Sequence, residues 1–474
     1  MGSRAAAAAA AAWLLLAAGG GAAAAFELPM YNAQAYPLFV HSPFTSWWLF
    51  GGDPTISDVW HVKQDKRAGM SAMVRVHNAS YRLLGAECTP GVRPFPSFVG
   101  TTVHPTRTVF HYRGLGLRIN LTFAKPVYIE RLESFTPITY VYLDAAQSSP
   151  SERPLELQFF FETPGQMATD KDSQTVAWSR DAWSEGSAHV SMGIGTARQE
   201  PFRLTDFWVD PRQPAEHIDW GQAHLTLPHA LPASRTLNAS SWMGSSNLAR
   251  STFAASGALP VGDDLAMPEP ACGNVTSGYY VCTCGVGMRG GNDYPTETAD
   301  NPIPGDLWPG LSVAFNLSAV GATPSRATAI VSYDDLGLTT RFFGKVLPEY
   351  WRRDGTTFAD LLRGASDGAA AAIAECERYD AELVAKFFAA GGEDFAVLAA
   401  AGYRSEVGWT TYAWFDGSFD SGDDAPAVDG EDVSGPIAFV KGIGSSGDTG
   451  TIDDNCKLPS LRAARACTTS SRSR

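Results

Sequence analysis

Two neighbouring segments, Arg107-Thr-Val-Phe-His-Tyr-Arg113 and Leu117-Arg-Ile-Asn-Leu-Thr-Phe123, decide the fold class of this chain. Both are short and rich in β-branched and aromatic residues, and glycine, proline or serine bounds such segments, which is typical of β-strands. Ile138-Thr-Tyr-Val-Tyr-Leu143 and Leu155-Glu-Leu-Gln-Phe-Phe-Phe161 repeat the pattern. Regular short strands of this kind predict an N-terminal β-sandwich, which we assign to residues 26–350.

The sequence changes character after Trp351. Residues 358–390 are rich in alanine and carry apolar side chains at helical spacing, which predicts a helix that begins after Thr356-Thr357 and ends at Gly391-Gly392. A second helix is expected from Glu393 to about Tyr412. We therefore expect a multidomain β plus α protein in which residues 351–456 begin an α domain.

Length and charge limit the functions that are open to the chain. Its 474 residues allow about three domains of roughly 150 residues. The 50 acidic and 36 basic residues give a net charge of −14, which argues against binding a phosphate backbone as the main task. We expect a small-molecule substrate and no nucleic-acid partner.

The N-terminus has the pattern of a secretory signal peptide. Arg4 precedes an apolar run from Ala5 to Ala18, and Ala23-Ala24-Ala25 offers a small-residue cleavage site before Phe26. The run is shorter than the roughly 20 apolar residues that a membrane anchor needs. Residues 1–25 are therefore predicted to be a signal peptide, and the protein to be secreted without a membrane partner.

Secretion predicts glycosylation and oxidised cysteines. The Asn-x-Ser/Thr sequons begin at Asn78, Asn120, Asn238, Asn274 and Asn316. Cys272 is expected to pair with Cys282 or Cys284 in a loop-closing disulfide, because this cluster lacks the ligand spacing of a zinc site. The acidic loop of residues 416–432 lacks the spaced ligands of an EF-hand, so no metal and no cofactor is expected.

Carboxylates are the best candidates for catalysis in the C-terminal part, because every histidine lies at or before His229. The chain has no HExxH or G-x-S-x-G motif, and the GxGxxG match at residues 285–290 lacks the flanking strand and helix of a dinucleotide site. A pair of carboxylates in a cleft can serve as acid and base near neutral pH. The candidate catalytic residues are Asp334, Asp335, Glu406, Lys441, Asp448, Thr451 and Asp453. For residues 441–453, a network of capped turns is the competing interpretation.

Tryptophans in the N-terminal part allow a second kind of site. Their rings could stack on pyranose sugars, although packing in the core is the competing interpretation for each one. The tryptophans concerned are Trp47, Trp48, Trp60, Trp178, Trp183, Trp208 and Trp220.

Several segments taken together resemble a known family. They are, in order, Pro37–Trp47, Val74–Gly85, Pro105–Phe110, Leu121–Pro126, Ser332–Asp335, Leu347–Trp351, Tyr403-Arg404 and Lys441–Asp453. In this order they resemble the fungal-type glutaminase A family of secreted proteins. The resemblance implies an N-terminal β-sandwich followed by a six-hairpin (α/α) toroid, and hydrolysis of L-glutamine to glutamate and ammonia.

The chain departs from this pattern at its C-terminal end. A toroid of twelve helices needs well over about 200 residues, whereas residues 351–456 supply about 100. Residues 457–474 carry five basic and no acidic side chains, an atypical basic tail. We therefore expect only the start of an (α/α)6 toroid, and a glutaminase-like amidohydrolase that truncation could inactivate. The alternatives are a carbohydrate-active enzyme and a non-catalytic extracellular module that binds a glycan.

Overall fold

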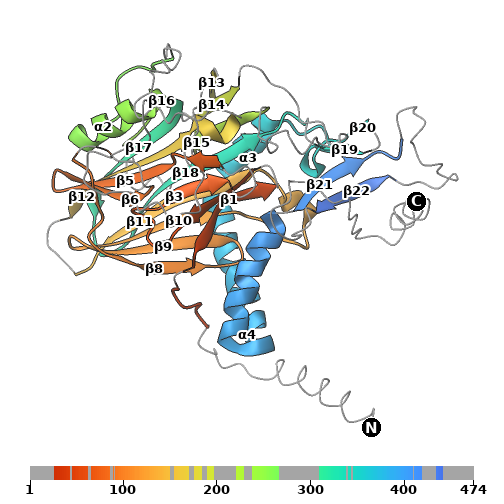
Figure 1. Cartoon of the computed structure of the whole chain (residues 1–474), viewed down its shortest axis with the longest axis horizontal. Helices are drawn as coiled ribbons and strands as arrows, with labels where there is room; N and C mark the ends of the chain where they lie inside the picture. Colours follow the sequence, from red (N-terminus) through yellow and green to blue (C-terminus); the bar gives the residue numbers. More distant parts are fainter. Residues whose placement is uncertain are drawn as a thin grey trace, which may run out of the picture.

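The computed structural model consists mostly of β-sheets, with helices packed on the outside (Figure 1). It describes residues 26–31, 33–42, 45–61, 66–85, 89, 91–149, 154–169, 176–183, 189–196, 220–228, 238–265, 309–337, 340–342, 345–408, 410–418 and 434–440. The predicted signal peptide, the clustered cysteines near Asn274 and the segment of residues 441–453 lie outside these ranges. Within the ranges, no helix is long and apolar enough to cross a membrane.

The largest sheet among the described residues has eight antiparallel strands. Its order is β13 (Val176–Trp183), β14 (His189–Thr196), β15 (Gln222–Leu227), β18 (Ser325–Asp334), β11 (Ile138–Gln147), β10 (Leu117–Ala124), β9 (Arg107–Gly114) and β8 (Phe98–Val103). The segments that predicted strands form β9, β10 and β11 here and β12 in the next sheet. Leu115 and Gly116 connect β9 to β10 with φ of +56° and +75°, as the twist of a tight hairpin requires.

A six-stranded sheet forms the second layer. Its order is β16 (Asn238–Ser245), β17 (Pro309–Val320), β12 (Leu155–Pro164), β5 (Ser71–Val76), β6 (Ala79–Leu84) and β7 (Arg93–Pro94). A four-stranded sheet of β1 (Ala35–Ser42), β2 (Thr45–Phe50), β3 (Asp58–His61) and β4 (Lys66–Ala68) contributes to the same core. Short pieces complete the β part: β19 (Arg341–Phe342) with β20 (Lys345–Val346), and the 3₁₀ turns η1 (Leu132–Ser134), η2 (Gly165–Ala168) and η3 (Tyr350–Arg352).

The sheets share one hydrophobic core, as expected for a sandwich-like arrangement. Phe123 of β10 and Phe161 of β12 meet edge to face with their ring centroids 6.1 Å apart. Trp47 and Trp220 are completely buried in this core, so neither ring is available to stack on a sugar. The core-packing interpretation therefore holds for these two residues.

Helix α3 (Phe358–Asp367) covers the outer face of the eight-stranded sheet. Thr357 and Asp360 form a reciprocal capping box at its start, which confirms the predicted helix boundary. Phe358 and Leu362 pack against Tyr140 and other outward-facing residues of β11. Burying each of these large side chains contributes about 1.5–3 kcal/mol, so packing on the sheet helps to hold α3 in place. Helix α2 (Ser246–Ser256) packs in the same way on the six-stranded sheet.

Helix α4 (Ala369–Gly408) agrees with the sequence prediction at one boundary and differs from it at two. Gly392, with φ of +79° and ψ of −165°, is not helical and separates two helical segments, which confirms the predicted break at Gly391-Gly392. The helix predicted for residues 358–390 is, however, also interrupted at Gly368. The second predicted helix ends at Gly408 rather than near Tyr412, because the following residues form β21 (Thr410–Phe415), which pairs with β22 (Gly435–Val440). The described residues contain no further helices of the predicted toroid.

Candidate active site

A group of ionisable side chains from distant parts of the chain lies at one end of the sandwich. We call it the Glu349 cluster, and it consists of His41, Lys125, Asp334, Asp335, Glu349 and Arg352. His41 stands near the end of β1, Lys125 follows β10, and the aspartates end β18. Three strands that are far apart in sequence therefore end close together, and the ionisable side chains at their ends form the cluster.

Glu349 stands at the centre of the cluster because its backbone is fixed on both sides. It forms an isolated antiparallel bridge with Ala413, and the Pro348 carbonyl accepts a hydrogen bond from Trp414 N at 2.9 Å. The chain then turns through η3, so the Trp351 indole donates to Glu349 Oε2 at 2.7 Å. Arg352 Nε lies 3.6 Å from the same oxygen. The carboxylate is thus oriented before any ligand arrives.

His41 and Lys125 occupy the other side of Glu349. His41 Nε2 lies 3.1 Å from Glu349 Oε1, and the Lys125 ammonium is 3.4 Å from His41 Nδ1. Lys125 also donates to the Thr136 carbonyl. While Lys125 is protonated it can only donate, so Nδ1 accepts and the imidazole carries its proton on Nε2, which donates to Glu349. The neutral histidine then connects Lys125 to Glu349.

Burial moves the pKa values of Glu349 and Lys125 towards neutrality. Desolvation raises the pKa of Glu349 to about 7, although Arg352 opposes the rise. Desolvation, helped by the nearby Arg404 charge, lowers the pKa of Lys125 to about 7. Burial and the Lys125 charge hold the pKa of His41 well below its usual value. Groups with such pKa values often occur at functional sites, although structural ion-pair networks also produce them.

The predicted carboxylates Asp334 and Asp335 lie on the more open side of the cluster. Arg352 Nη2 is 2.5 Å from Asp334 Oδ1 and 3.7 Å from Asp335 Oδ1. The side chain of Asp334 is 15% exposed, against 7% for that of Glu349. The structure thus unites the two predicted aspartates and adds Glu349, Arg352 and His41, which the sequence analysis did not single out.

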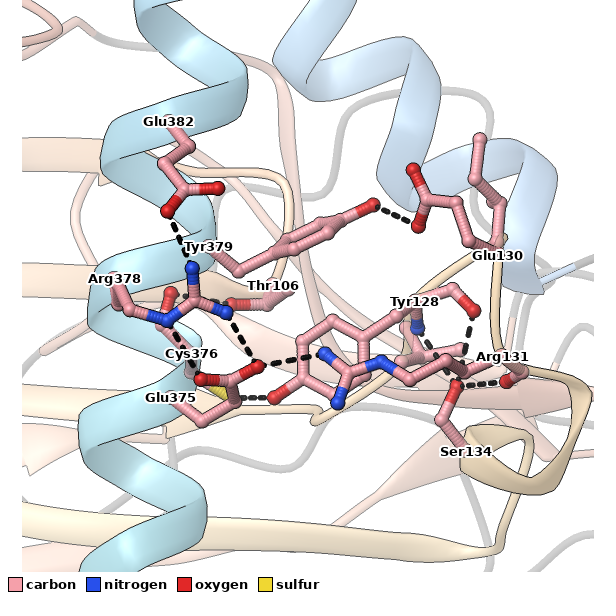
Figure 2. A network of polar contacts seen from close by, with 12 residues as sticks. Thr106, Tyr128, Glu130, Arg131, Ser134, Glu375, Cys376, Arg378, Tyr379 and Glu382 are labelled. Atoms are coloured by element: carbon pink, nitrogen blue, oxygen red, sulfur yellow. Dashed lines mark hydrogen bonds and ion pairs between the residues drawn. The ribbon is translucent and has the colours of Figure 1, made fainter.

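Helix α4 is fastened to the loop after β10 by a separate set of polar contacts (Figure 2). Arg131 donates to Glu375 at 2.7 Å, and the Tyr379 hydroxyl donates to Glu130 Oε2 at 3.0 Å. The Tyr128 hydroxyl lies 3.7 Å from the buried Cys376 thiol. These contacts fix the helix against the sandwich without touching the Glu349 cluster.

Buried contacts of α4 connect this set to the cluster. The Asp380 carboxylate accepts from Thr106 N and Oγ1, both at 2.8 Å, and from Arg107 Nε at 2.7 Å. Arg404 donates to the Thr106 carbonyl at 2.9 Å, and the backbone N–H of Lys125 donates to that carbonyl at 2.8 Å. The position of α4 therefore fixes the charge that helps to lower the pKa of Lys125.

The remaining predicted site residues are not part of the cluster. Glu406 is exposed on α4, and its carbonyl, not its side chain, accepts from Thr410 at 2.9 Å. Lys441, Asp448, Thr451 and Asp453 lie outside the described residues. Across the part of the chain that the structure describes, no group of three or more His, Cys, Asp and Glu side chains could hold a metal ion.

Part of the chain matches a known family model. Residues 106–271 match the family model described as a domain of unknown function, DUF5127. No curated protein matches the chain. The matched segment covers roughly a third of the sequence and, within the described residues, runs from the start of β9 through α2. It includes Lys125 and Thr106 but ends before Asp334, so the match describes the β-rich part of the chain.

Proposed function

We propose that the chain is a secreted glutaminase-like amidohydrolase whose acid–base centre is the Glu349 cluster. The observation that supports this most is spatial: most segments that carry the family resemblance lie close together in the folded chain. They supply His41, Thr106, Lys125, Asp334, Asp335, Glu349 and Arg404.

The cluster offers the groups that amide hydrolysis needs. An activated water or nucleophile, a base and donors for the oxyanion are required. Asp334 and Asp335 are the carboxylates nearest to solvent, and we assign the base to this pair. Arg352 offers a guanidinium beside them for a developing negative charge. Glu349 and His41 are positioning residues, since the Glu349 carboxylate contacts Trp351, Arg352 and His41.

A product panel tests this proposal against its alternatives. The full chain is incubated with L-glutamine and with a set of glycans, and ammonia and reducing sugar are measured. We expect ammonia from glutamine. Reducing sugar without ammonia would identify a carbohydrate-active enzyme using the same carboxylates, and glycan binding without either product would identify a binding module.

A pair of adjacent arginines provides a matched control. Arg352→Gln removes the guanidinium next to Asp334, whereas Arg353→Gln removes one whose contacts are the Tyr350 carbonyl and Asp354. We expect kcat/KM for ammonia release to fall by at least about tenfold in the first variant and to change by less than about twofold in the second. Equal effects would contradict the assignment.

A further inference from the structure

A cavity of about 240 Å³ opens on the outer face of the eight-stranded sheet, away from the Glu349 cluster. We call it the β9–β11 pocket, after the strands that form its floor. Met30, Val99 and Pro324 supply apolar walls, and the polar part is lined by His111, Arg113, Arg118, Asn120 and Asp144. Its volume is below the roughly 300–1,000 Å³ of drug-sized sites, so it suits a compact ligand.

Two arginines of the pocket lie directly opposite each other on neighbouring strands. Arg113 of β9 and Arg118 of β10 are direct cross-strand partners beside the hairpin turn. Like charges placed directly opposite each other destabilise a sheet. Within the described ranges, neither guanidinium has a hydrogen-bond or ion-pair partner, although both side chains line the pocket. The arrangement is costly as it stands and would be relieved by an anion.

The side-chain acceptor atoms of Asp144, Asn120 and His111 each already have a hydrogen-bond donor. Arg326 binds both carboxylate oxygens of Asp144, at 2.7 and 2.8 Å. Asn120 Oδ1 lies 3.0 Å from His111 Nδ1, and Thr102 Oγ1 lies 3.0 Å from His111 Nε2. Because an amide oxygen only accepts, His111 carries its proton on Nδ1 and accepts from Thr102. What remains free in the pocket is the Asn120 amide N–H₂ and two guanidinium groups, all of them donors.

We infer that the β9–β11 pocket binds a compact oxyanion, either a carboxylate or a phosphate or sulfate group. Guanidinium forks match the geometry of such groups and bind them in a bidentate manner. Both Asp144 oxygens already accept from Arg326, and the pocket groups that lack a partner are donors, which favours an oxyanion over a neutral sugar. This inference does not depend on the proposed hydrolase activity, because the pocket and the Glu349 cluster share no residue.

Calorimetric titration of the full chain tests the inference. The ligands are inorganic phosphate, sulfate, glucuronate and glucose, in a buffer that contains no other oxyanion. Glucuronate and glucose share a ring and differ in the carboxylate, so the pair isolates the charge. We expect phosphate or glucuronate to bind and glucose not to bind, and affinity to fall as salt rises. Tighter binding of glucuronate than of phosphate would identify a carboxylate ligand.

Variants locate the binding. Arg113→Gln and Arg118→Gln should each weaken the affinity by about tenfold or more, because each removes charge-assisted hydrogen bonds. Asn120→Asp, which presents an acceptor instead of a donor, should abolish binding. Arg93→Gln is the matched control, since Arg93 is exposed on β7 of the other large sheet. The inference is overturned if no oxyanion binds, if glucose binds as well as glucuronate, or if Arg93→Gln weakens binding as much as the pocket variants do.

Discussion

His41 Nε2 lies 3.1 Å from Glu349 Oε1 across 308 residues of sequence, and both side chains are buried. The contact ties the end of β1 to the segment that begins η3. Because Lys125 occupies the other ring nitrogen of His41, an acid and a base are linked through one imidazole inside the protein. Stability should therefore depend on pH in a way that can be assigned to named groups.

The first prediction concerns the acidic limb of the pH profile. The folded-state pKa of Glu349 is raised to about 7 from 4.5, so the unfolded state releases this proton more readily. The contribution of Glu349 to stability is therefore fully present below about pH 4.5 and is lost as the pH rises to about 7. Urea unfolding as a function of pH should show this loss in the parent and not in Glu349→Gln. Parallel profiles for the two proteins would contradict the assignment.

A second prediction concerns the alkaline limb. Burial lowers the folded-state pKa of Lys125 to about 7 from 10.5, so the unfolded state binds this proton more tightly. The contribution of Lys125 to stability should rise between about pH 7 and pH 10.5. Lys125→Met should remove this rise while leaving the acidic limb in place. Exposed Lys386, for which the same change is expected to leave both limbs unaltered, serves as the control.

A third prediction tests the attachment of α4. Asp380→Ala removes the acceptor for Thr106 and the buried partner of Arg107, and leaves the Arg107 guanidinium with the more exposed Glu377, 3.7 Å away. Such changes cost about 3–5 kcal/mol. Glu382→Ala, on the same helix, removes an exposed ion pair with Arg378 and should cost less than about 1 kcal/mol. The measurement is the free energy of unfolding in urea, and similar losses in the two variants would show that the buried contacts do not hold the helix.

A fourth prediction uses two glycines in α4. Gly392 has φ of +79° and ψ of −165°, a conformation essentially restricted to glycine that costs other residues about 1–3 kcal/mol, so Gly392→Ala should destabilise the protein. Gly402 lies within the helix with no atom within 4 Å of an added Cβ, so Gly402→Ala should stabilise it by about 0.5–1 kcal/mol. Thermal unfolding measures both changes. If both substitutions changed the melting temperature in the same direction, α4 would not turn at Gly392.

The fifth prediction concerns glycosylation. Asn78 is exposed on the turn between β5 and β6, and Asn316 is exposed on β17. Asn120 is half-buried and uses its side-chain oxygen for His111. In protein secreted from a eukaryotic host, peptide mapping should find glycans on Asn78 or Asn316 and an unmodified Asn120. A glycan on Asn120 would fill the β9–β11 pocket and would also overturn the inferred oxyanion site.

The strands could be predicted because alternation and composition are local properties. Residues 107–113 and 117–123 became adjacent strands because each places alternate side chains in the shared core. The break at Gly368 was not predicted, since the surrounding alanines favour helix and the break depends on how α3 packs on the sheet. The region around Tyr412 was predicted to be helical and became a strand through pairing with residues 435–440, a non-local cause.

The site could be predicted only in part for the same reason. Asp334 and Asp335 were recognisable as adjacent carboxylates, but nothing local distinguishes Glu349 from the other glutamates of the chain. Its properties come from His41, Lys125 and Arg352, which the fold brings to it. The Pro348-Glu349-Tyr350-Trp351 sequence was part of the family resemblance, and this was the available signal.

Ammonia release from L-glutamine by Asp334→Asn tests the central claim most directly. The control is Asp354→Asn, in which an aspartate with a 74% exposed side chain loses its charge outside the cluster. We predict that kcat/KM falls by about 10²–10⁴ in Asp334→Asn protein that circular dichroism shows to be folded, and stays at the parent value in Asp354→Asn. Ammonia release by Asp334→Asn at the rate of the control would contradict the assignment of the Glu349 cluster as the active site.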